Sequence, residues 1–232
     1  MKPERRKPEP RKPRRQKRAR AKRAEAQPEP PRDVLEYERR FWGSGRSVAG
    51  VDEVGRGPLA GPVVAAAVVL CEGVCIEGAD DSKVLDAETR LELFERIRSC
   101  AACIGVGAAS AKEIDRRNIL RATTVAMERA LAKLRVCPDH VVVDGLPLKH
   151  LGREHDAVVD GDAIVHSIAC ASIVAKVVRD RLMHRLALRY PGYFWDRNVG
   201  YGTPEHLAAI DALGVTPHHR LTFTGLQFEL EI

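Results

Sequence analysis

Two adjacent carboxylates, Asp52 and Glu53, follow a short apolar run, Val48 to Val51, and precede a glycine-bracketed turn at residues 55–58. Side chains alternate between faces along a strand, so both carboxylates can face one metal site only if the strand bends there. Glycines permit such a bend and allow the backbone to approach a ligand. A lone Asp-Glu pair is more often a solvated hairpin turn. The flanking glycines and the arginine inside the turn favour a site that performs chemistry.

Two further carboxylates follow apolar segments later in the chain. His140 to Val143 predicts a buried strand that ends in Asp144. A carboxylate at the C-terminal end of a strand is a common metal ligand in an α/β sheet and an equally common turn starter. Asp162 follows a short strand predicted at Ala157–Val159 and stands where a long amphipathic helix is expected to begin, so it could also cap that helix.

Local patterns predict the elements that would position these acids. Val63 to Leu70 predicts a fully apolar strand, and residues 104–109 predict another. Asp86 can cap a helix that ends near Cys100. Residues 110–113 form a capping box that opens a second helical region, which is interrupted near Asn118. Strands that alternate with helices in this way are typical of an α/β domain.

The charge of the chain is unevenly distributed. Residues 1–32 hold 14 Lys or Arg and 4 Asp or Glu, whereas the rest of the chain holds 24 and 28. This first segment has almost no large apolar residues, so we expect a disordered basic arm that contacts nucleic acid. A solvated tail without a specific role is the alternative. Residues 33–46 predict a lead-in helix and a linker.

Cysteine usage and hydropathy indicate a soluble, cytoplasmic protein that does not contact a membrane. Cys100-x-x-Cys103 lacks a second ligand pair at a spacing suited to zinc, so we expect the six cysteines to be buried free thiols. No apolar run is long enough to span a bilayer, and the basic N-terminus has no apolar signal core. We expect a monomer.

The sequence resembles type 2 ribonuclease H, the ribonuclease HII family. The resemblance rests first on Asp-Glu-x-Gly-Arg-Gly-Pro-Leu-x-Gly-Pro-Val at residues 52–63. Shorter matches are Asp-Ser-Lys at 81–83, Asn-Ile at 118–119, Gly-Asp at 161–162, Ser-x-x-Ala-Lys at 172–176 and Gly-Tyr-Gly-Thr at 200–203. Val84, Asp160 and Val199 depart from the pattern, since many relatives carry lysine there. The resemblance covers residues 47–224, and residues 225–232 alternate between apolar and polar as an extended tail or edge strand would.

The resemblance implies an α/β fold of the ribonuclease H type: a mixed five-stranded sheet flanked by helices, with a C-terminal helical segment. It implies that the catalytic carboxylates, which would hold two Mg²⁺ or Mn²⁺ ions, are Asp52, Glu53, Asp144 and Asp162. Such hard cations prefer oxygen ligands, and a pair of them can promote in-line displacement at a phosphodiester. The implied substrate-binding residues are Gly55, Arg56, Gly57, Ser82, Lys83, Asn118, Ser172, Lys176 and Tyr201.

The implied activity is cleavage of the RNA strand of RNA–DNA hybrids and incision on the 5′ side of single ribonucleotides in duplex DNA, leaving 3′-hydroxyl and 5′-phosphate ends. The 2′-hydroxyl distinguishes RNA from DNA at a given site. The resemblance implies that the Gly-Arg-Gly turn and Tyr201 recognise the junction between ribose and deoxyribose. Type 3 ribonuclease H is the nearest alternative, but it usually has lysine in place of Arg56 and a folded N-terminal domain. A non-catalytic nucleic-acid-binding protein is the alternative from another class.

Overall fold

The structure is a computed structural model that describes residues 33–79 and 85–223. The predicted basic arm at 1–32, the substrate residues Ser82 and Lys83, and the tail predicted at 225–232 lie outside the described residues.

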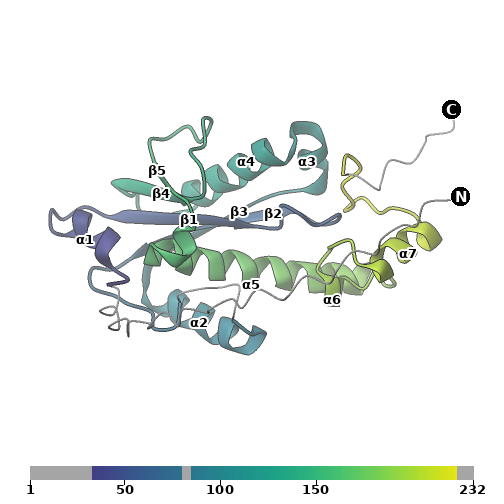
Figure 1. Cartoon of the computed structure of the whole chain (residues 1–232), viewed down its shortest axis with the longest axis horizontal. Helices are drawn as coiled ribbons and strands as arrows, with labels where there is room; N and C mark the ends of the chain where they lie inside the picture. The colour runs from purple at the N-terminus through teal and green to yellow at the C-terminus, as the bar shows by residue number, and fades with distance from the viewer. Residues whose placement is uncertain (1–32, 80–84, 224–232) are drawn as a thin grey trace, which may run out of the picture. The chain divides into compact units, whose positions relative to one another are not determined.

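A mixed five-stranded sheet forms the centre of the described part of the chain (Figure 1). Its spatial order is β3-β2-β1-β4-β5, and the strands are β1 (Val48–Val54), β2 (Val63–Leu70), β3 (Ala101–Ala109), β4 (His140–Asp144) and β5 (Asp156–Val158). β1 pairs antiparallel with β2 and parallel with β4. The predicted five-stranded mixed sheet is therefore confirmed, and the strand that carries the adjacent carboxylates lies at its centre.

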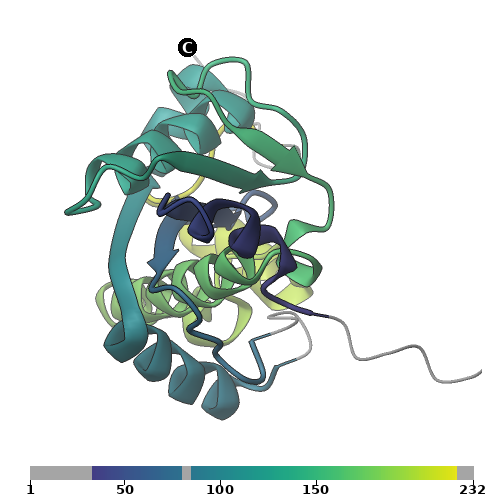
Figure 2. The same ribbon diagram turned by 90° about the vertical axis from the view of Figure 1, so that its left-hand side faces the viewer.

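Helices cover both faces of this sheet (Figures 1 and 2). One face carries α3 (Ala111–Arg117) and α4 (Ile119–Ala132), and the other carries α2 (Ala87–Cys100) and α5 (His166–Arg189). The remaining helices are α1 (Glu36–Trp42), the 3-10 turn η1 (Gly161–Ala163), α6 (Trp195–Asn198) and α7 (Pro204–Leu213). The last two form the predicted C-terminal helical segment. No helix in residues 33–79 and 85–223 combines the length and apolar character needed to cross a membrane.

Polar side chains set several helix starts where the sequence predicts them. The Asp86 carboxylate accepts a hydrogen bond from the N–H of Thr89 at 2.8 Å and begins α2. Ser110 and Glu113 form the expected capping box of α3. Asn118 takes a positive φ of 66° that ends α3, and its side chain then caps α4. The predicted interruption of the helical region is confirmed.

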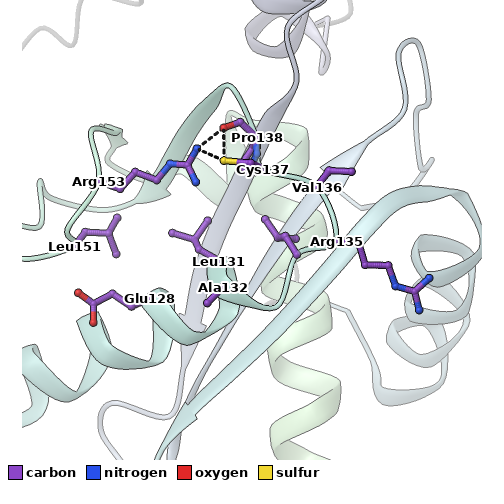
Figure 3. Close-up of a pocket in the computed structure, with 10 residues that line it drawn as sticks. Glu128, Leu131, Ala132, Arg135, Val136, Cys137, Pro138, Leu151 and Arg153 are labelled. Carbon is purple, nitrogen blue, oxygen red and sulfur yellow. Dashed lines mark hydrogen bonds between the residues drawn. The ribbon is translucent and has the colours of Figure 1, made fainter.

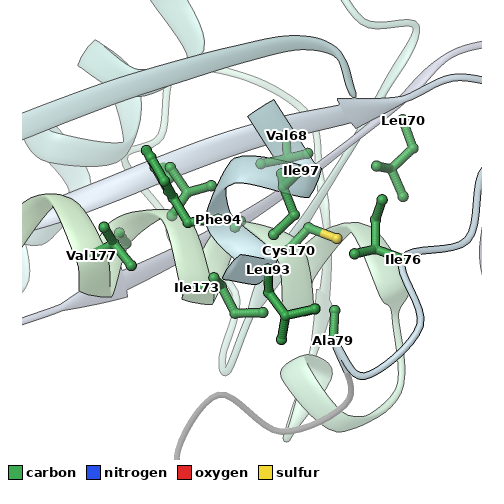
Figure 4. Packing of buried hydrophobic residues seen from close by; sticks show 14 of the residues in the cluster. Val68, Leu70, Ile76, Ala79, Leu93, Phe94, Ile97, Cys170, Ile173 and Val177 are labelled. Atoms are coloured by element: carbon green, nitrogen blue, oxygen red, sulfur yellow. The ribbon is translucent and has the colours of Figure 1, made fainter. Parts of the chain in front are cut away.

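Buried apolar side chains form a core on each face of the sheet. β2 is buried along its whole length because helices cover it from each side. On the α5 side, Val68 and Leu70 of β2 pack with Phe94 and Ile97 of α2 and with Ile173 of α5 (Figure 4). Each such fully buried side chain contributes about 1.5–3 kcal/mol to the free energy of unfolding.

The start of α5 differs from the prediction. Asp162 lies in the 3-10 turn, and α5 begins four residues later at His166. The residue that precedes α5 is Val165, which makes no side-chain capping bond. Asp162 is therefore not the cap of the long helix.

The six cysteines form no disulfides with one another, as predicted, but most of them are not buried. Cys103 and Cys170 are buried, whereas Cys71, Cys75, Cys100 and Cys137 are exposed. Cys100 illustrates the reason, because it is the last residue of α2 and lies on the solvent side of that helix end. The prediction that all six thiols are buried is wrong.

Candidate active site

β1 runs straight through the two adjacent carboxylates. It extends to Val54, and no register shift interrupts its pairing with β2. A Cβ at Gly50 would overlap the backbone of α5, whereas Val51 belongs to the core cluster under α4. By alternation, Asp52 faces the α5 side of the sheet and Glu53 faces the α4 side. The bend that would turn both carboxylates to one face is not formed, so that expectation is wrong.

The parallel neighbour β4 brings Asp144 beside Asp52. The last paired residues of these strands are Val51 and Val143, so the next residues along each strand are neighbours on one face. Oδ1 of Asp144 accepts a hydrogen bond from the N–H of Gly161 at 2.7 Å. This bond ties the end of β4 to the 3-10 turn that contains the buried Asp162. The segments that carry the four predicted carboxylates therefore meet at the C-terminal ends of β1 and β4.

Burial and like charge make these carboxylates unfavourable neighbours. The pKa of Asp52 is raised to about 8, first by burial and then by the charges of Glu53 and Asp144, while a hydrogen bond from Ser172 opposes the shift. Burial also raises the pKa of Glu53. Arg56 opposes that shift, because its guanidinium donates to Oε1 of Glu53 at 3.1 Å. A proton or a cation would relieve this excess of negative charge.

The donor set fits a hard divalent cation by its chemistry. All the donors are carboxylate oxygens, which Mg²⁺ and Mn²⁺ prefer, and the raised pKa of Asp52 marks negative charge that a cation would neutralise. Within the described residues, no three His, Cys, Asp or Glu side chains converge into a metal-ligand cluster. Ligation of a metal ion by Asp52, Glu53, Asp144 and Asp162 therefore remains a prediction.

A pocket of about 470 Å³ opens beside Glu53 and Asp144. Its walls come from the first half of α4 and from the loop at residues 145–150, and they include the basic residues Arg121, Lys149 and His150. A pocket lined by several basic residues suits an anionic chain. The sequence analysis missed these three residues because nothing local distinguishes them from other surface cations.

A second pocket, of about 360 Å³, lies beyond the C-terminal end of α4 (Figure 3). Its wall includes Arg153, whose guanidinium donates to the carbonyl oxygen of Pro138 and to Sγ of Cys137. None of the predicted site residues lines this pocket. It is therefore separate from the carboxylate site.

The glycine-bracketed turn packs against the segment that contains Tyr201. The N–H groups of Leu59 and Ala60 donate to the carbonyl oxygen of Gly200 at 2.8 and 3.1 Å. A Cβ at Gly57 would lie 3.6 Å from the Tyr201 ring, which is 46 % exposed. The structure therefore brings together the turn and the tyrosine, which the resemblance links in one role although they are far apart in the sequence.

The remaining predicted substrate residues are engaged in contacts within the protein. Ser172 is buried and hydrogen-bonds to Asp52. Nζ of Lys176 donates to Oδ1 of Asp180 at 2.8 Å. The side chain of Asn118 caps α4. Contact of these three side chains with a phosphate backbone remains a prediction.

Two buried residues, Arg179 of α5 and Arg220 after α7, reach the turn although the sequence analysis assigned a role to neither of them. Arg179 had a detectable signal. It lies at helical spacing from Ser172, Lys176 and the buried Met183, so a cation occupies the inward stripe of the helix.

Comparisons with known proteins agree with the resemblance. A family model described as Ribonuclease HII matches residues 49–226. Ribonuclease HII of Geobacillus thermodenitrificans is 49 % identical over 201 residues, which cover 86 % of this chain and 77 % of that protein. Ribonuclease HII of Thermosynechococcus vestitus is 55 % identical over 193 residues, which cover 82 % and 89 %. The crystal structure of ribonuclease H2 from Pyrococcus horikoshii OT3 is 29 % identical, with a TM-score of 0.67, and covers 78 % of this chain and 95 % of that one.

Proposed function

The chain belongs to the ribonuclease HII family, which makes it an endonuclease acting on RNA–DNA hybrids, and we propose that it also incises duplex DNA 5′ to a single embedded ribonucleotide. The products would carry 3′-hydroxyl and 5′-phosphate ends. The observation that carries this proposal is that the Tyr201 ring lies beside Gly57 of the Gly-Arg-Gly turn, directly after the acidic end of β1. An exposed ring beside a turn without bulky side chains offers a surface for one sugar and its 2′-hydroxyl.

The proposed catalytic residues are Asp52, Glu53, Asp144 and Asp162, which would hold Mg²⁺ or Mn²⁺. Enzymes of this family depend on divalent metal ions, which supply charge neutralisation and Lewis acidity at the scissile phosphate. The chain's own contribution is to orient the ligands. Ser172 restrains Asp52, the N–H of Gly161 restrains Asp144, and Arg56 restrains Glu53.

Basic residues around the carboxylates would bind the nucleic-acid backbone. Arg121 and Lys149 in the pocket and the proposed contacts Asn118 and Lys176 lie on the elements around the acidic strand ends. We assign a supporting electrostatic role to the arm at residues 1–32, which carries 14 Lys or Arg. Removing the arm should make the logarithm of the association constant depend less steeply on the logarithm of salt concentration, because fewer counterions are released. An unchanged slope would exclude the arm from binding.

The proposal is tested with three substrates: a DNA duplex with one ribonucleotide, an all-DNA duplex and a hybrid with a continuous RNA strand. With Mg²⁺ or Mn²⁺, we expect incision of the first substrate 5′ to the ribonucleotide, cleavage of the hybrid and no cleavage of DNA. Cleavage of the hybrid alone would contradict recognition of a single ribonucleotide. End-labelling of the products checks the predicted 3′-hydroxyl and 5′-phosphate.

A further inference from the structure

Two fully buried arginines lie beneath the glycine-bracketed turn. Both Arg179 and Arg220 are 0 % exposed. The guanidinium of Arg220 donates to the carbonyl oxygens of Gly55 at 2.5 Å, Arg56 at 2.8 Å and Gly61 at 3.0 Å. It therefore holds the start of the turn and also Gly61, which follows the turn.

Arg179 holds the second half of the same loop from the other side. Its guanidinium donates to the carbonyl oxygens of Ala60 at 3.2 Å, Pro62 at 3.1 Å and Val199 at 3.0 Å. The bond to Val199 also holds the segment that contains Gly200. The carbonyl oxygen of Gly200 in turn accepts hydrogen bonds from the N–H groups of Leu59 and Ala60. A Cβ at Gly55 would overlap the Arg179 side chain, so glycine is required there for this close approach.

These arginines are costly to bury. No ion pair within the described residues includes either of them, so carbonyl oxygens compensate their charge, together with the charges of Asp180 for Arg179 and of Asp115 for Arg220. The pKa of Arg220 is lowered to about 9, first by burial and then by the charge of Arg179. Buried cations without a carboxylate partner require complete hydrogen bonding. Only the forked, five-donor guanidinium can reach three diverging carbonyls in this way.

The bonds to Gly55 and Arg56 also determine where the following N–H groups point. A trans peptide is planar with its C=O and N–H on opposite sides, and the described chain has no cis peptides. Because Arg220 draws both carbonyls inward, the N–H groups of Arg56 and Gly57 point outward. Within the described residues, neither N–H donates a hydrogen bond to the protein, and Gly57 lies beside the Tyr201 ring.

We infer that Arg179 and Arg220 are positioning residues for ribonucleotide recognition, which hold the N–H groups of Arg56 and Gly57 toward the substrate. The inference rests on the proposed function of the turn. The arginines themselves do not touch substrate. They act by fixing the peptide planes that do.

Arg220→Lys and Arg179→Lys test this role, because lysine keeps the charge but loses the fork. Arg129→Lys is the matched control, since Arg129 also donates to a backbone carbonyl, that of Ala108, and to Glu113, but not to the turn. Hydrogen exchange of the full-length, folded proteins is measured at the amides of Leu59, Ala60 and Gly61. We expect at least about tenfold faster exchange in the two turn variants and no change in the control.

Cleavage kinetics supply a readout that a purely structural role would not move. At a temperature where each variant is folded, kcat/KM is compared for the single-ribonucleotide duplex and the continuous hybrid. We expect the ratio of the two to fall about tenfold in Arg220→Lys, mainly through KM, and to stay constant in Arg129→Lys. An equal loss on both substrates, or unchanged exchange at the turn, would overturn the inference.

The outcomes separate this inference from the proposed function. If the wild-type protein does not incise at a single ribonucleotide, the proposed function fails, and amide exchange alone decides whether the arginines hold the turn. If neither lysine variant folds, hydrogen exchange of the wild-type protein tests the inference. Its amides at Leu59 and Gly61 should then be protected as strongly as those of β2, and exchange at loop-like rates would overturn the inference.

Discussion

The carboxylate site and the arginine-supported turn are adjacent along β1, yet they compensate buried charge in opposite ways. Asp52, Glu53 and Asp144 repel one another, and the compensation for Asp52 has to come from a proton or a cation. Arg179 and Arg220 also repel each other, but six carbonyl oxygens of the protein itself compensate them. The buried charge of the turn is thus compensated within the protein, whereas the pKa of Asp52 stays raised to about 8 because the protein itself compensates its charge only in part.

Asp144→Asn should produce the largest effect in this comparison. Asparagine keeps an Oδ1 that can accept from the N–H of Gly161, but it removes one negative charge. We expect hybrid cleavage to fall by roughly 1,000-fold while hybrid binding persists, measured by single-turnover cleavage and a binding titration. The variant should also unfold at a higher temperature without added metal, because repulsion with Asp52 is reduced. Unchanged cleavage would remove Asp144 from the mechanism.

Acidification should weaken the support of the turn through a buried histidine pair. Nδ1 of His206 lies 2.8 Å from the carbonyl oxygen of Tyr201, and its Nε2 lies 3.2 Å from Nε2 of His219. Burial, and then the neighbouring His206, lower the pKa of His219 to about 4. His219 therefore binds a proton less readily in the folded state than in the unfolded state. The stability that the neutral His219 contributes is fully present above pH 6.5 and is lost as the pH falls toward 4.

The expected loss is about 3 kcal/mol in the free energy of unfolding between these limits, measured by urea denaturation at a series of pH values. His219→Gln serves as the control, since it should remove that part of the pH dependence. A wild-type stability that does not change across this range would contradict a neutral, buried His219.

Adding Mg²⁺ should give the smallest effect on stability. It should also distinguish the carboxylate site from the arginine-supported turn. A cation bound by the carboxylates of the folded state should raise the free energy of unfolding by about 1–3 kcal/mol at concentrations well above its dissociation constant. Thermal unfolding with and without Mg²⁺ measures this. The increment should shrink in Asp144→Asn and persist in Arg220→Lys. Loss of the increment in Arg220→Lys would show that the two regions are not independent.

Much of the fold was predictable because its signals are local. The caps at Asp86 and Ser110, the break at Asn118 and the apolar run of β2 involve residues within a few positions of one another. The start of α5 was not predictable in this way. The N–H of Ser167 donates to Glu38 at 2.8 Å, a residue 129 positions earlier, and Nε2 of His166 accepts from the N–H of Ile76 at 2.8 Å. No local pattern could reveal those partners.

The sequence by itself determined the chemistry available to this protein: carboxylates at the ends of apolar strands, a turn bracketed by glycines, and a motif long enough to identify the family. The tertiary structure decided how these parts are arranged. Regular pairing of β1 with β2 sends Asp52 and Glu53 to opposite faces, and Arg220 meets Gly55 across 165 positions. Alternation along a strand is a local property, but the group that lies opposite a side chain depends on which distant segments pack together.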